Sequence, residues 1–84
     1  MAKKERYTIT WCESSHDDFH HEHLPTFQAA SAFAQNLVQE GKTFHSAAGI
    51  DKEFAEREQD DDGYFVSWVV EESWEHDGTD CYNI

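Results

Sequence analysis

The stretch PTFQAASAFAQNLVQEG, residues 25–41, decides the fold more than any other part of the chain. Its apolar residues recur at intervals of three and four, which places them along one face of a helix. Thr26 is a residue type that caps helix N-termini, and Gly41 suits the position just after a helix, where φ is often positive. The pattern therefore predicts a helix from Thr26 to about Glu40. Its apolar face consists of Phe27, Ala30, Phe33, Ala34, Leu37 and Val38.

Two stretches on either side of this helix have the composition of β-strands. Arg6–Glu13 alternates large apolar residues with threonine, and Tyr64–Trp74 is rich in valine and aromatic residues. Both patterns favour a strand with one face buried. We expect the helix residues Phe27, Phe33, Leu37 and Val38 to pack on Tyr7, Ile9, Trp11, Tyr64, Val66 and Trp68.

The remaining segments give weaker signals. Residues 42–50 form a weaker strand candidate, and residues 51–58 fit either a short helix or a frayed strand end. Residues 80–84 fit a short final strand, whereas residues 1–5 and 14–24 are expected to be irregular. The predicted fold is therefore α+β: one small domain over residues 1–84, with the order β-α-β-(α)-β and a small antiparallel or mixed sheet packed on one main helix.

The overall charge narrows the range of partners. Eighteen Asp and Glu residues against six Lys and Arg give a formal net charge of −12 on 84 residues. A chain this acidic is repelled by nucleic acid and by anionic membrane surfaces. It has no apolar stretch of the roughly 18 residues that span a bilayer, and its N-terminal residues do not resemble a signal peptide. We therefore expect a cytoplasmic protein that binds neither nucleic acid nor membrane directly.

The negative charge is concentrated in the second half of the chain. Residues 1–42 hold four cations and six anions, a net charge of −2, whereas residues 43–84 hold two cations and twelve anions, a net charge of −10. Such an excess could be a solvated face that keeps a small domain soluble. It also fits a surface that binds a groove lined with Lys and Arg. The candidate partner-binding residues are Asp60, Asp61, Asp62, Glu71, Glu72, Trp74, Glu75, Asp77 and Asp80. Trp74 and Tyr82 are expected to act as aromatic anchors if they are exposed.

A histidine-rich segment offers an alternative site. The segment HDDFHHEH at residues 16–23 combines imidazole and carboxylate groups, which are ligands for Zn²⁺ and other divalent metals. The metal-binding alternative would use His16, His20, His21 and His23. No cofactor is expected if the segment is only a loop. We expect no enzymatic activity, since the chain contains no phosphate-binding glycine loop and no serine nucleophile motif.

Two parts of the chain resemble known groups of proteins. The segment YTITW at residues 7–11, followed by the helix at residues 27–41, resembles small phage- and prophage-encoded βαβ proteins over about half of the chain. The acidic second half is similar in character to anti-CRISPR and anti-restriction proteins that imitate DNA. This resemblance implies a non-catalytic inhibitor in the host cytoplasm that blocks a basic nucleic-acid-binding protein, such as a CRISPR effector, by DNA mimicry or steric blocking. A structural or assembly subunit is a further alternative.

Overall fold

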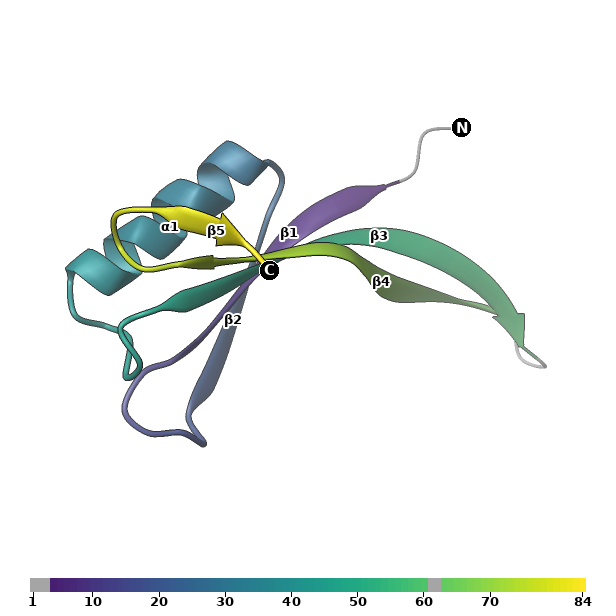
Figure 1. Cartoon of the computed structure of the whole chain (residues 1–84). Helices are drawn as coiled ribbons and strands as arrows, with labels where there is room; N and C mark the ends of the chain where they lie inside the picture. Colours follow the sequence, from purple (N-terminus) through teal and green to yellow (C-terminus); the bar gives the residue numbers. More distant parts are fainter. Residues whose placement is uncertain (1–3, 61–62) are drawn as a thin grey trace.

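The computed structural model describes the backbone of residues 4–60 and 63–84 and the side chains of residues 4–56 and 67–84. The elements in chain order are β1 (Glu5–Cys12), β2 (Phe19–Leu24), α1 (Phe27–Gln39), β3 (Ala48–Asp60), β4 (Gly63–His76) and β5 (Cys81–Asn83). The strands form one antiparallel sheet with the order β2-β1-β3-β4-β5. Helix α1 lies on one face of this sheet (Figure 1). Across the described residues no second helix covers the opposite face, which we call the open face.

The predicted helix is confirmed, including both of its ends. Thr26 has an extended backbone, and its side-chain oxygen accepts a hydrogen bond from the backbone N–H of Ala29 at 3.1 Å. At the other end Gly41 adopts a φ of 71°, and the N–H of Lys42 donates to the carbonyl of Leu37 at 2.9 Å. These contacts satisfy backbone groups that a helix end otherwise leaves unpaired.

The core lies between α1 and the central strands. Ile9 of β1 and Ile50 of β3 stand opposite each other on the helix side of the sheet and are the two largest fully buried side chains in the described part of the protein. Ala30 and Ala34 are also fully buried. Their small side chains allow the helix to approach the sheet closely, so that a thin core is still well packed. The buried cluster consists of Ile9, Ala30, Ala34, Leu37, Ala48 and Ile50.

Three predicted segments differ from the observed elements. The expectation that residues 14–24 are irregular is wrong for Phe19–Leu24, which is the edge strand β2. An edge strand with few buried side chains lacks the apolar alternation by which strands are recognised. The strand predicted at residues 42–50 begins only at Ala48, and residues 51–58 continue that strand instead of forming a short helix. The chain order is thus ββαβββ, and the sheet is antiparallel throughout.

A β-bulge in the β3–β4 hairpin changes which side chains face the helix. Lys52 pairs with Glu72 but Glu53 pairs with Val70, so Glu71 has no partner in the register. Because strand side chains alternate between faces, this extra residue moves Val70 and Trp68 to the open face. The prediction that Trp68 packs under the helix is therefore wrong. Its place is taken by Trp74, which contacts the rings of Tyr7 and Phe27. The side chains of Tyr64 and Val66 lie outside the described residues.

The outer part of the β3–β4 hairpin projects beyond the helix and the other strands (Figure 1). The molecule is accordingly elongated, with principal extents of 45 × 27 × 18 Å. In the part of the chain that the structure describes, no helix has the length and hydropathy required to cross a membrane.

Two glycines with positive φ provide a test of how the end of α1 packs on the β4–β5 turn. A Cβ atom at Gly78 (φ +95°) would lie 2.9 Å from Cγ1 of Val38, whereas one at Gly41 (φ +71°) would meet nothing within 4 Å. Gly41→Ala should cost about 1–2 kcal/mol of unfolding free energy, from backbone conformation alone. Gly78→Ala should cost more, because the steric clash adds to the backbone term. Urea denaturation of both variants measures the difference.

A double-mutant cycle isolates the clash. Val38→Ala removes the atom that the new Cβ would meet, so it should destabilise the Gly78→Ala protein less than it destabilises the wild type. Equal losses for Gly41→Ala and Gly78→Ala, or a cycle with no coupling, would contradict the described packing.

Candidate partner-binding surface

The charge asymmetry of the sequence becomes an asymmetry of the folded sheet. Strands β3, β4 and β5, which lie next to one another, all come from the second half of the chain, where the net charge is −10. Strands β2 and β1 come from the first half, where the net charge is −2. One side of the sheet is therefore strongly acidic and the other is nearly neutral. We call the β3–β4–β5 side the acidic side.

The predicted acidic residues follow this side of the molecule instead of forming one compact cluster. Asp60 ends β3 at the tip of the hairpin, where its side chain, together with Asp61 and Asp62, lies outside the described residues. The others occupy β4 and the β4–β5 turn, and all of them are exposed: Glu71, Glu72, Glu75, Asp77 and Asp80. The ammonium group of Lys52 lies 4.0 Å from the Glu71 carboxylate, a spacing that neutralises little of this charge in water.

The β4–β5 turn concentrates negative charge around an aromatic residue. The Asp77 carboxylate accepts hydrogen bonds from the backbone N–H groups of Asp80 at 2.8 Å and Thr79 at 2.9 Å, and these bonds lower the pKa of Asp77. The carboxylates of Asp77 and Asp80 in turn raise the pKa of the Tyr82 phenol. Tyr82 is 54% exposed. An exposed ring among ionised carboxylates suits contact with a cationic partner.

Trp74 does not belong to this exposed surface. It is half-buried on the helix side of the sheet, where it packs against the core cluster, so the exposure on which its predicted role as an interface anchor depends is not observed. Uninterrupted alternation would place Trp74 on the same face as Trp68, whereas the bulge at Glu71 separates the two residues onto opposite faces of the sheet. Tyr82, on the open face opposite Glu75, is the exposed aromatic residue at this end of the sheet.

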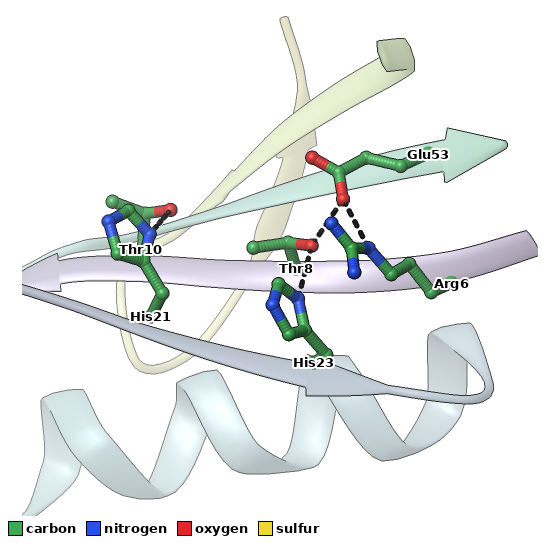
Figure 2. A network of polar contacts seen from close by, with 6 residues as sticks. All are labelled: Arg6, Thr8, Thr10, His21, His23 and Glu53. Carbon is green, nitrogen blue, oxygen red and sulfur yellow. Dashed lines mark hydrogen bonds and ion pairs between the residues drawn. The ribbon is translucent and has the colours of Figure 1, made fainter. Parts of the chain in front are cut away.

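A polar network on the open face was not predicted from the sequence. Figure 2 shows Thr8 of β1 between His23 of β2 and Glu53 of β3. The Thr8 hydroxyl donates to Oε1 of Glu53 at 2.6 Å, and Nε of Arg6 donates to the same oxygen at 2.7 Å. Since the single hydroxyl proton of Thr8 points to Glu53, Nδ1 of His23, at 2.9 Å, donates to the Thr8 oxygen. The opposite charges of Arg6 and Glu53 were visible in the sequence, but the strand register that joins them was not.

The network fixes the protonation of Glu53 and the position of Arg6. Burial of Glu53 favours the neutral acid, but the hydrogen bonds from Thr8 and Arg6 outweigh this effect and lower its pKa. The guanidinium carbon of Arg6 also lies 3.7 Å from the centre of the Trp68 ring. Arg6 is therefore held between a carboxylate and an aromatic face, and it ties β1 to both β3 and β4.

The predicted metal-binding histidines do not converge on one point. His21 and His23 lie on the open face, where they contact Thr10 and Thr8, whereas His20 points to the helix side and stacks on Trp11. His16 lies in the β1–β2 turn against Phe44 and His45. Among the residues whose side chains are described, no group of three or more His, Cys, Asp or Glu is placed to hold a metal ion. The two cysteines, Cys12 and Cys81, are not bridged to each other.

The lowered pKa of Glu53 predicts a pH-dependent contribution to stability. The ordinary value is 4.5, so the folded protein binds this proton less readily than the unfolded chain. The stabilisation is present above pH 4.5 and is lost as the pH falls through the folded-state pKa. The difference in unfolding free energy between wild type and Glu53→Gln should therefore be largest at neutral pH and shrink below pH 4.5. Urea denaturation at several pH values between 7 and about 3 measures it.

Thr8→Val serves as a matched control for this effect. It removes the hydroxyl that donates to Glu53 and leaves a side chain of similar shape, so introducing Glu53→Gln in this background should give a weaker pH dependence. A difference between wild type and Glu53→Gln that stays constant over the whole pH range would show that the network does not hold Glu53 ionised.

Comparison of the chain with protein-family models, with curated proteins and with solved structures finds no match.

Proposed function

We propose that this protein is an acidic inhibitor that binds the basic nucleic-acid-binding surface of a partner protein through its acidic side. The observation that carries this proposal is the net charge of −10 on residues 43–84, which form the adjacent strands β3, β4 and β5. A partner that holds nucleic acid through Lys and Arg, such as a CRISPR effector, has the complementary charge.

The density of charge is comparable to that of a nucleic acid strand. A net charge of −12 along a long axis of 45 Å corresponds to about one negative charge per 3.8 Å. Each strand of B-DNA carries one phosphate per about 3.4 Å of axis. A cationic groove that accepts a strand therefore meets a similar charge density on this protein, which supports competition between the two for the same groove.

The shape of the molecule also supports binding in a groove. The β3–β4 hairpin projects beyond the helix (Figure 1), and β3 ends at Asp60. A projecting hairpin can enter a channel that the wider body of the domain cannot enter. The acidic side would first steer the protein to the groove and then exclude the nucleic acid sterically.

The affinity that exposed charges alone can provide is limited. Exposed ion pairs contribute about 0.2–1 kcal/mol each and weaken with added salt. Several pairs are needed for useful affinity, which is consistent with carboxylates spread along β4 and the β4–β5 turn. Exposed aromatic and apolar groups on the same side, Tyr82 and Val70, would supply contacts that do not depend on salt.

Competition with DNA tests the proposal. A fluorescent duplex bound to a purified CRISPR effector should be displaced by this protein at low salt and less well at high salt. A quadruple variant should need at least about a tenfold higher concentration to displace the duplex, because four charge contacts are lost. It carries Glu71→Gln, Glu72→Gln, Glu75→Gln and Asp77→Asn. Fluorescence anisotropy at two salt concentrations measures both effects.

The chain offers a control with the same change in net charge. Glu13→Gln, Asp17→Asn, Glu22→Gln and Glu40→Gln also remove four carboxylates, all from the first half. This control should compete almost as well as the wild type. The proposal fails if both quadruple variants lose the same amount. It also fails if a panel of basic nucleic-acid-binding proteins, CRISPR effectors among them, shows no displacement at low salt.

A further inference from the structure

A small cavity opens on the open face where the acidic side meets the β1–β2 end of the sheet. Its volume is about 300 Å³, which is at the lower end of the range for ligand pockets and suits a single side chain. Four strands and the loop before β3 contribute to its walls. The lining residues that matter here are Thr10, Cys12, Phe19, His45, Gly49 and Glu75.

Gly49 lines the cavity and has no side chain to enter it. Gly49 pairs with Thr10 on one side and Glu75 on the other, so the three residues share the open face. The φ angle of Gly49 is not in the left-handed region, and a Cβ atom there would meet nothing closer than the Thr10 carbonyl oxygen at 3.7 Å. Neither backbone conformation nor close packing therefore requires glycine at this position. Its effect is to leave the space between Thr10 and Glu75 on the open face free of a side chain.

The groups around this space are those that recognise an organic cation. Glu75 is exposed and provides a carboxylate, and Phe19 provides a ring that is 60% exposed. The polar groups deeper in the cavity already have partners, since Thr10 contacts Nδ1 of His21 and the Cys12 thiol contacts the His16 carbonyl. A planar guanidinium can stack on a ring and pair with a carboxylate at the same time.

The same face of the sheet already holds one guanidinium in this way. Arg6 lies 3.7 Å from the centre of the Trp68 ring, and its Nε lies 2.7 Å from the Glu53 carboxylate. Glu75 of β4 and Phe19 of β2 also line one cavity on this face, with β1 and β3 between their strands, and no Lys or Arg is among the residues that line it.

We propose that this cavity binds the guanidinium group of an arginine side chain on the partner, paired with the Glu75 carboxylate and above Gly49. The inference rests on the proposed function and makes it more specific, since it assigns one binding position on the acidic side. Arginine is favoured over lysine because only the planar guanidinium can form two parallel hydrogen bonds to one carboxylate.

An NMR titration tests the cavity without the partner. ¹⁵N-labelled protein is titrated with N-acetyl-argininamide and, in parallel, with N-acetyl-citrullinamide, which has nearly the same shape but no charge. The amides of Thr10, Phe19, Gly49 and Glu75 should shift with the arginine compound, with saturation in the millimolar range, and should not shift with the citrulline compound. N-acetyl-lysinamide should bind more weakly than the arginine compound.

Three variants locate the binding position. Glu75→Gln should weaken binding about tenfold, as expected for the loss of one charged hydrogen-bonding partner. Gly49→Val should abolish binding by filling the cavity, and its spectrum shows whether the fold is retained. Glu71→Gln removes a carboxylate from the same strand outside the cavity, and it should leave the affinity within about twofold of the wild type.

Any one of three results would overturn the inference. The four amides could show no shift with tens of millimolar argininamide, or they could shift equally with the citrulline compound. Glu71→Gln and Glu75→Gln could also lose the same affinity for the arginine compound. The competition assay with DNA is independent of these results. If the protein displaces DNA but does not bind argininamide, the arginine site is refuted and the proposed function still stands. If it binds argininamide but displaces no DNA, the proposed function is refuted and the arginine site still stands.

Discussion

The structure depends on the contact between Ile9 and Ile50 on adjacent central strands, beneath the two buried alanines of α1. Nearly all of the fully buried apolar surface of the described residues lies in this contact and its immediate neighbours. A core of this size can cover only one face of a five-stranded sheet. The other face must therefore be stable in water, which explains the threonine, histidine and carboxylate side chains that pair with one another along β2, β1 and β3.

The same constraint explains where the negative charge lies. Twelve anions on half of a small chain repel one another, and this repulsion opposes compaction. The acidic strands extend beyond the helix, so part of the charge is carried by a hairpin that is remote from the core. Closer to the core, individual carboxylates are hydrogen-bonded: Glu53 by Thr8 and Arg6, and Asp51 by the Ser73 hydroxyl at 2.7 Å.

The sequence was sufficient to predict the elements whose side chains are periodically buried. The helix at residues 27–39, the strand that begins near Arg6 and the long strand that ends near Trp74 all have a clear apolar period, and all are present. The sequence did not predict β2, because this exposed edge strand lacks the apolar alternation by which strands are recognised. The acidic residues were identified by counting charges, but their distribution depends on strand order. The Thr8–Glu53–Arg6 network and the cavity at Gly49 depend on cross-strand register, which no local pattern contains.

The bulge at Glu71 has a consequence for how such a protein can evolve. Glu72 and Val70 pair with Lys52 and Glu53, which are consecutive in β3, so the register of the hairpin does not depend on the presence of Glu71. An in-frame deletion of this codon would make the alternation of β4 continuous and would leave Trp68 and Val70 on the open face. A gene of this kind can thus lose or regain one carboxylate at its acidic side by a single codon, while Ile9, Ile50 and the helix keep their places.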